Sequence, residues 1–180
     1  MNSPRPFIVV HEQHGFTLIE ILITLVITAF GLLALAGFVT KATTLTADAA
    51  QRARAGILLN DMASRIANHK VIAANFVTGA AQGSAAIDCT GKTDATLDLC
   101  EWNNLLTGAN DAGSTSAAIL GYRGCITAGG SGDYIVTVAW GSLTPGVPPP
   151  AGVDCGKDEF GDESLRRIIR TVVRVATLSA

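Results

Sequence analysis

A single carboxylate stands near the start of the longest apolar run in the chain. Residues 15–20 read GFTLIE, and the apolar stretch that begins there continues to Val39. A charged side chain at membrane depth costs at least ~2.5 kcal/mol, so it indicates a function and a nearby partner. The nearest candidate partner for Glu20 is an α-amino group. We therefore interpret Glu20 as a functional residue that pairs with a positive charge.

Side chains with the chemistry of an enzyme site are sparse. Of the three histidines, only His69 lies beyond the apolar run. We interpret it as an exposed or packed residue and expect no second polar group beside it. The chain has no nucleophile elbow, no dinucleotide-binding fingerprint and no phosphate-binding loop. The sequence therefore predicts no catalytic residue and no cofactor.

An acidic cluster occupies residues 154–163, and its oxygen atoms are of the kind that calcium prefers. The cluster does not follow the EF-hand pattern, and Lys157 lies inside it. We therefore favour a solvated loop, which could also pair with Arg166 and Arg167, over a metal site.

Four cysteines lie beyond the apolar run: Cys89, Cys100, Cys125 and Cys155. In an exported domain, an even count indicates two disulfides, with three possible connectivities. We prefer the sequential pairing, which closes loops of moderate length. A zinc site is the alternative, but it would need ligand-like spacing or more histidines.

Residues 16–39 are long and apolar enough to cross a bilayer as one helix. A cleavable secretory signal would have a shorter apolar region. Residues 34–37 could serve as its cut site, but the run before them is too long and includes Glu20. An uncleaved anchor is the other alternative.

The helix is predicted to continue, because proline is absent from residues 16–76 and apolar residues recur at steps of three or four. This stripe contains Leu58, Leu59, Met62, Ile66, Ala73 and Phe76. We expect a single helix over 16–76, of which residues 40–76 are the amphipathic half. Such a helix offers one face for a sheet to cover.

The remainder of the chain is predicted to be a loop, a short helix and a small antiparallel sheet. The loop covers residues 78–95, and the helix covers 98–106, ends at Gly108 and buries Trp102. Strands are expected at 117–127, 134–140 and 166–178, with a turn at 128–133 and a proline-rich segment at 141–152. The predicted class is α+β.

The charge balance does not favour nucleic acid as a partner. Lys and Arg number 13 against 15 Asp and Glu, and the formal net charge is −2. The basic residues of the first helix are Lys41, Arg52, Arg54, Arg65 and Lys70. We interpret them as a solvated face or a subunit interface.

The string from Gly15 to Glu20 resembles the processing site of type IV prepilins and of type II secretion pseudopilins. The resemblance implies that residues 1–15 are a leader and that a membrane aspartyl peptidase cuts between Gly15 and Phe16. It also implies that Phe16 becomes N-methylated, and that Glu20 of one subunit neutralises the new amine of its neighbour. The leader departs from the pattern, since Arg5 is offset by Glu12 and its basic charge is weak.

The order of elements resembles the pilin fold, a long N-terminal helix on a small sheet with a disulfide-stapled C-terminal region. Residues 123–126, 134–140 and 166–167 further resemble the PilV family of minor pilins, the type IV pilus modification proteins. This implies a globular domain at 77–180 and a single-pass inner-membrane protein, with its N-terminus cytoplasmic before cleavage, that later reaches the pilus or cell surface.

The partners that this resemblance implies are the prepilin peptidase, other minor and major pilins, and the inner-membrane assembly platform. The expected function is a minor pilin that primes assembly or joins the tip complex, and so supports adhesion or motility. A minor pseudopilin of type II secretion is the main alternative. A DNA-uptake or surface-binding minor pilin is a further one.

Overall fold

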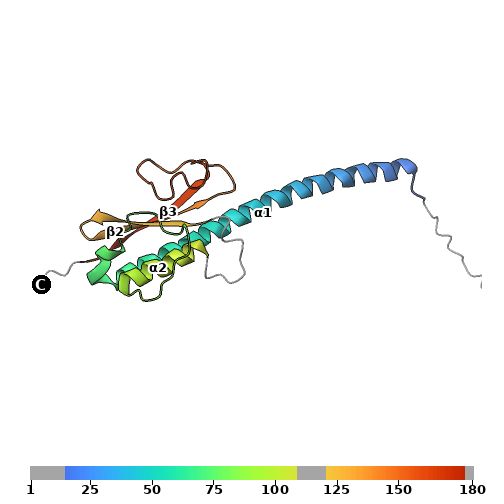
Figure 1. Cartoon of the computed structure of the whole chain (residues 1–180). Coiled ribbons are helices and arrows are strands. Elements are labelled where there is room, and N and C mark those ends of the chain that lie inside the picture. The colour runs from blue at the N-terminus through green and yellow to red at the C-terminus, as the bar shows by residue number, and fades with distance from the viewer. Residues whose placement is uncertain (1–14, 109–120, 177–180) are drawn as a thin grey trace, which may run out of the picture. The chain divides into compact units, whose positions relative to one another are not determined.

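The computed structural model describes residues 15–108 and 121–176 (Figure 1). Its elements follow the order α1 (Leu18–Asn68), the 3-10 helix η1 (Lys70–Phe76), α2 (Asp94–Thr107), β1 (Arg123–Gly130), β2 (Asp133–Gly141) and β3 (Arg166–Arg174). The chain divides into two compact units, residues 1–43 and 44–180. The long apolar helix, the small antiparallel sheet and the disulfides confirm the predicted α+β class.

The first unit is helical from Leu18 onward, and the side chains of residues 15–41 are all exposed. Among the described residues, α1 is the one helix that is long and apolar enough, by length and composition, to cross a membrane. Leu, Ile and Ala dominate this part of α1, and the absence of proline lets the backbone hydrogen bonds run without interruption.

In the second unit, α1 presents one buried stripe to the rest of the domain. The buried residues are Gln51, Ala55, Leu58, Leu59, Met62 and Ile66. They recur at steps of three or four, so they lie on one side of the helix, as predicted.

The α-helix ends earlier than predicted, at Asn68 and not at residue 76. His69 has non-helical angles (φ −103°, ψ 50°), and Ile72 departs from helical geometry within η1. The tighter 3-10 turn rotates the chain relative to α1 and still places Ala73 and Phe76 in the core. The residues of the predicted apolar stripe are therefore buried, but they belong to two helices of different kinds.

Helix α2 begins one turn before the predicted start. Thr93 and Thr96 form a capping box at its N-terminus, and Gly108 ends it in the left-handed conformation (φ 75°). Trp102 is fully buried, and its indole N–H donates to the Leu58 carbonyl of α1 at 2.9 Å. Its predicted role in the core is thereby confirmed.

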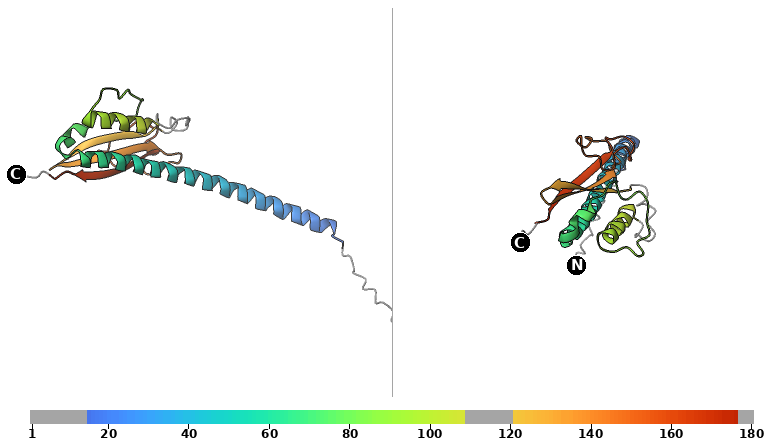
Figure 2. Two further views of the ribbon diagram at one scale, coloured as in Figure 1. Left: turned by 90° about the horizontal axis from the view of Figure 1, so that it is seen from below. Right: turned by 60° about the vertical axis from the view of Figure 1, so that its left-hand side comes forward.

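The sheet has the order β1-β2-β3, and both pairings are antiparallel. Helix α2 lies beside the second-unit part of α1, on one face of this sheet (Figure 2). Ile126, Val136 and Val138 point to that face and are fully buried. The opposite face is partly covered by residues 142–165, which the disulfide Cys125–Cys155 ties to β1.

The first strand differs from its predicted bounds. It begins at Arg123, and residues 117–120 of the predicted strand lie outside the described residues. It continues through Gly130, because the reversal occurs at Ser131 and Gly132, whose φ angles are +52° and +81°. The predicted turn over 128–133 is thus too long. The predicted second and third strands correspond to β2 and β3, but β3 ends at Arg174, earlier than predicted. Residues 177–178 of the predicted strand lie outside the described residues.

Candidate processing and assembly site

The Gly15–Phe16 bond precedes the first helix. Residues 15–17 have no regular secondary structure, and the side chain of Phe16 is 80% exposed. A β-carbon built on Gly15 would have no described atom within 4 Å. A peptidase needs an accessible segment outside regular secondary structure, and this junction has both properties. The rest of the predicted leader, residues 1–14, lies outside the described residues.

Thr17 caps the first turn of α1 and is linked to Glu20. The Glu20 N–H donates to the Thr17 carbonyl at 3.1 Å and also points at the Thr17 hydroxyl at 3.4 Å. Thr-x-x-Glu is the capping-box pattern, in which the residue three positions after the cap is acidic. This role of Thr17 is not among the sequence predictions, although the Thr-x-x-Glu pattern is visible in the sequence.

Glu20 lies in the first turn of α1, where the helix dipole favours a negative charge. The side chains near it in the sequence are exposed and apolar, among them Phe16 before the helix and Ile19 and Ile23 on it. Among the described residues, no cation contacts the Glu20 carboxylate, since the ion pairs all lie elsewhere in the chain. The structure thus leaves this carboxylate available to a group outside the described chain.

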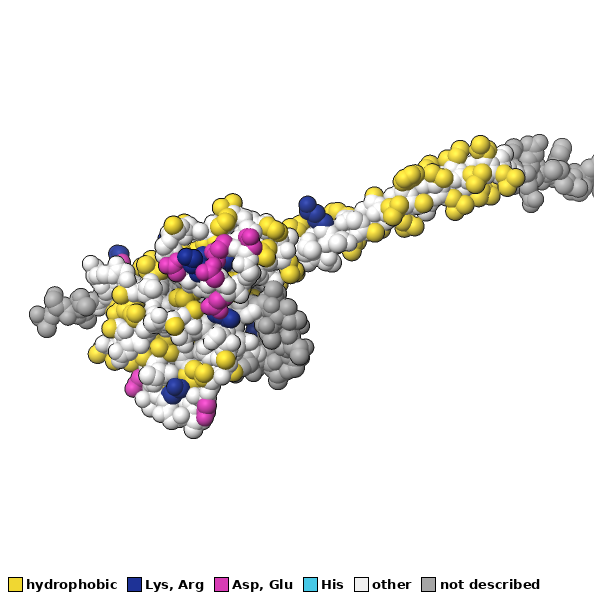
Figure 3. Space-filling view, turned by 45° about the horizontal axis from the view of Figure 1, so that its top comes forward, with side chains coloured by type: hydrophobic (Ala, Val, Ile, Leu, Met, Phe, Trp, Pro, Cys, Tyr) yellow, Lys and Arg dark blue, Asp and Glu magenta, His cyan; other side chains and the backbone are white. Residues whose placement is uncertain are grey.

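Hydrophobic side chains are spread along the exposed surface of the described part of the first unit (Figure 3). The large side chains concerned are Phe16, Leu18, Ile19, Ile21, Leu22, Ile23, Leu25, Val26, Ile27, Phe30, Leu32, Leu33, Leu35, Phe38 and Val39. A patch of this length on a soluble surface would favour aggregation. The surface therefore requires lipid or other helices around it.

The threonines within this surface are satisfied inside the helix. Thr24 donates to the Ile21 carbonyl at 2.8 Å, and Thr28 donates to the Thr24 carbonyl at 2.6 Å. These bonds remove the cost of placing a hydroxyl in an apolar medium. Glu20 differs from these threonines, because its carboxylate has no partner among the described residues.

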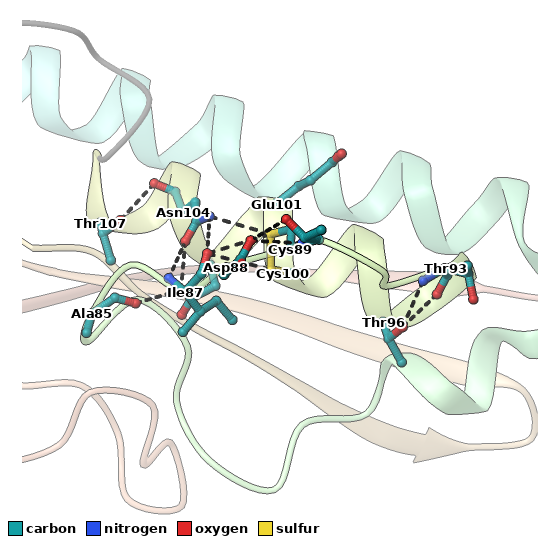
Figure 4. Close-up of a disulfide and its surroundings, with 12 residues drawn as sticks. Ala85, Ile87, Asp88, Cys89, Thr93, Thr96, Cys100, Glu101, Asn104 and Thr107 are labelled. Carbon is teal, nitrogen blue, oxygen red and sulfur yellow. Dashed lines mark hydrogen bonds between the residues drawn. A yellow bond between two sulfur atoms is a disulfide. The ribbon is translucent and has the colours of Figure 1, made fainter.

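The cysteines form two disulfides, Cys89–Cys100 and Cys125–Cys155, which is the sequential pairing. In the first of these, Cys89 lies in the loop before α2 and Cys100 on α2 itself (Figure 4). Asn104 supports the same loop, because its amide donates to the Ile87 carbonyl at 2.8 Å and its oxygen accepts from the Ile87 N–H at 2.9 Å. These contacts fasten residues 84–92 to α2.

The expectation that no polar group lies beside His69 is wrong. Its Nε2 lies 3.3 Å from Oδ2 of Asp98, and Arg65 donates to the same carboxylate at 2.7 Å. Partial burial lowers the pKa of Arg65, but hydrogen bonds from its guanidinium to Glu101 and Asp98 outweigh that effect and raise the pKa above its ordinary value. The cluster joins α1 to α2 through ion pairs.

Two of the acidic residues in 154–163 pair with arginines. Glu159 pairs with Arg123, and Glu163 accepts from Arg166 Nε at 2.7 Å. Arg166 is 3% exposed and also donates to the Val153 and Cys155 carbonyls. Among the described residues, no group of three or more His, Cys, Asp or Glu is placed to hold a metal ion. The predicted pairing of this loop with Arg166 is confirmed.

Two of the basic residues of α1 are engaged within the second unit. Arg65 is engaged by three carboxylates, and Arg54 lies over the Tyr122 ring at 5.8 Å from its centroid. Arg52 is exposed and has no partner among the described residues.

The N-terminal segment matches a known family model. The model, described as the prokaryotic N-terminal methylation motif, covers residues 11–36 and so includes Gly15, Phe16 and Glu20. Neither among curated proteins nor among solved structures was a match to the chain found. This motif is the signal of type IV pilins, which confirms the resemblance at the N-terminus. It implies processing by prepilin peptidase and assembly with pilins in a membrane machinery.

Proposed function

We propose that this chain is a minor pilin of a type IV pilus. The observation that carries the proposal is the methylation motif at residues 11–36, which coincides with a non-helical Gly15–Phe16 junction and an exposed apolar helix. The exposed apolar helix supports a function in assembly, because it offers a surface on which like helices can pack.

In the proposed sequence of events, the chain enters the inner membrane with its N-terminus in the cytoplasm. The prepilin peptidase then cuts after Gly15, and the new N-terminal Phe16 is methylated. Residues 16–39 hold the mature chain in the membrane as a single span. The domain at 77–180 and residues 40–76 lie outside the membrane and later reach the pilus.

Glu20 guides the assembly step. Cleavage creates an amine at Phe16, four residues before Glu20, so every mature subunit carries one charge of each sign at the same end of its helix. In an apolar filament core, an unpaired charge of either sign is costly, and pairing Glu20 with the amine of a neighbour removes both costs. The pair therefore fixes the axial register of neighbouring helices more than it adds stability.

The proposed place of this chain is among the minor pilins that prime assembly or form the pilus tip, as the resemblance of its C-terminal strands to the PilV family suggests. Its contacts would then be with other minor pilins, with the major pilin and with the inner-membrane assembly platform. Through the pilus it would support adhesion or motility. A minor pseudopilin of type II secretion would share the N-terminal half, and it is the alternative to be tested.

The test is a deletion of the gene in its host, with the intact chain restored from a plasmid as the control. We expect surface pili, counted by electron microscopy, and twitching motility to fall on deletion and to return on restoration. Secretion of folded exoenzymes should remain unchanged. Loss of secretion with normal piliation would contradict the proposal and identify a pseudopilin.

A further inference from the structure

Between α1 and one end of the sheet, the second unit has a pocket of about 320 Å³. It is lined by Asp48, Ala49, Arg52, Trp140, Ser142, Thr144 and Arg167. This volume lies in the range of small-molecule sites, about 300 to 1,000 Å³. All of these residues belong to one compact unit. The assembly signal at the N-terminus does not use any of them.

The pocket contains an unused hydrogen-bond donor on a buried side chain. Trp140 is 5% exposed, and its indole N–H has no hydrogen-bond partner among the described residues. Its nitrogen is not one of the fully enclosed unsatisfied atoms, and Trp140 is among the residues that line the pocket. Buried tryptophan N–H groups usually have an acceptor. By contrast, the N–H of Trp102 is satisfied by the Leu58 carbonyl.

Two arginines add positive charge to the same space. Arg167 pairs across the sheet with Trp140 and is held in place by donating to the Ser164 and Thr144 carbonyls, each at 2.7 Å. Arg52 reaches the pocket from α1, and its guanidinium is exposed and without a partner in the described part of the chain.

The acidic residue of the pocket is already engaged. The Asp48 carboxylate accepts hydrogen bonds from the hydroxyls of Ser142 at 3.3 Å and Thr144 at 3.0 Å. With Arg52 and Arg167 against Asp48, the lining has one excess positive charge, and its unused groups are donors. A monoanion whose oxygen atoms accept from both an N–H and a guanidinium satisfies these groups, and a planar carboxylate fits a guanidinium best.

We propose that this pocket binds a small organic carboxylate, with Arg52 and the Trp140 N–H as its direct donors and Arg167 as a fixed positive charge. The ligand would be larger than acetate, since the pocket exceeds the volume of a carboxylate group, and an acidic sugar is of suitable size. This activity is separate from the proposed role in the pilus and does not depend on it.

The two tryptophans of the chain provide the test. The full chain, labelled with ¹⁵N at the indole, is placed in non-ionic detergent micelles, and sodium glucuronate, sodium acetate, sodium phosphate or sodium chloride is added at equal ionic strength. Trp140→Phe assigns the two indole signals. We expect glucuronate to shift the Trp140 signal saturably, acetate to do so more weakly, and the Trp102 signal to stay in place.

Arg52→Gln should weaken glucuronate binding by about fivefold, which is the upper end of the effects measured for a single exposed ion pair. Arg170→Gln is the matched control, because it removes an exposed arginine that does not line this pocket and should leave binding unchanged. The proposal is overturned if the Trp140 signal does not move, if it moves equally with chloride, if it responds to phosphate and not to carboxylates, or if both arginine variants bind alike.

Discussion

The indole ring of Trp102 occupies the space that a side chain on Gly124 would need. A β-carbon at residue 124 would lie 2.6 Å from Cζ3 of Trp102 and 2.7 Å from Cδ1 of Leu106. Helix α2 can therefore lie directly against strand β1 because residue 124 has no side chain. This contact connects the helix that carries Cys100 to the strand that carries Cys125.

Gly124→Ala should destabilise the second unit by about 1–3 kcal/mol, because the added methyl group overpacks the core between α2 and β1. Chemical unfolding monitored by tryptophan fluorescence in detergent measures the effect. Gly79→Ala is the matched control, since a β-carbon there meets no described atom within 4 Å. Equal stability of the two variants would show that the indole can move aside.

Removal of Cys125–Cys155 should cost more stability than removal of Cys89–Cys100. The two disulfides close loops with sequence separations of 30 and 11 residues. The chain-entropy estimate for such loops is about 4 and about 3 kcal/mol. Paired serine variants, compared by urea unfolding under oxidising conditions, test the order. The reverse order would mean that residual structure or packing, and not loop length, controls the difference.

Acid should destabilise the domain in part through Glu163. The hydrogen bond from Arg166, followed by that from the Asp158 N–H, holds the pKa of Glu163 below its ordinary value of 4.5. The unfolded chain therefore binds a proton at Glu163 more readily than the folded chain does. The stability that Glu163 contributes to the fold is complete above pH 4.5 and is lost as the pH falls toward the folded pKa. Glu163→Gln should flatten this part of the stability profile. Asp158→Asn, which removes an exposed carboxylate, serves as the control; a profile unchanged by Glu163→Gln would refute the assignment.

Gly15→Leu should leave the precursor uncleaved. A peptidase site that requires a residue without a side chain cannot accept leucine, so the chain should run at full length on a gel and lack a methylated Phe16 by mass spectrometry. Gly31→Leu makes the same change inside α1, where a β-carbon also meets no described atom, and should be processed normally. Cleavage of both variants would contradict the proposed peptidase site.

Glu20→Val should preserve membrane insertion and reduce incorporation into sheared pili by at least about tenfold, because the amine of the neighbour would remain unpaired in an apolar core. Thr24→Val is the control, since its hydroxyl bonds within its own helix. Immunoblots of membrane and pilus fractions measure both steps. Normal incorporation of the Glu20 variant, in a strain that depends on this chain, would count against the charge pair.

Elements that follow from local patterns could be predicted from the sequence. The stripe that includes Leu58, Met62 and Ile66 is inward-facing because helical periodicity alone places these residues together. Gly108 ends α2 because glycine readily adopts the left-handed conformation. Strand β3 alternates between buried Val173 and exposed Arg174, as its sequence indicates.

Features that depend on distant contacts could not be predicted in this way. The pairing of Arg166 with Glu163 follows from the sequence, but the burial of Arg166 does not, because its hydrogen bonds to the Val153 and Cys155 carbonyls produce no local pattern. The 3-10 helix η1 begins directly after His69, where α1 ends. Arg52 of α1 and Trp140 of β2 line the same pocket, and they come together only when the domain folds.

The boundary between the two compact units, at residues 43 and 44, separates the methylation motif from the disulfide-bonded domain. Gly15, Phe16 and Glu20 lie on one side of it, whereas both disulfides lie on the other. Substitutions in the second unit therefore leave residues 11–36, which the family model matches, unchanged.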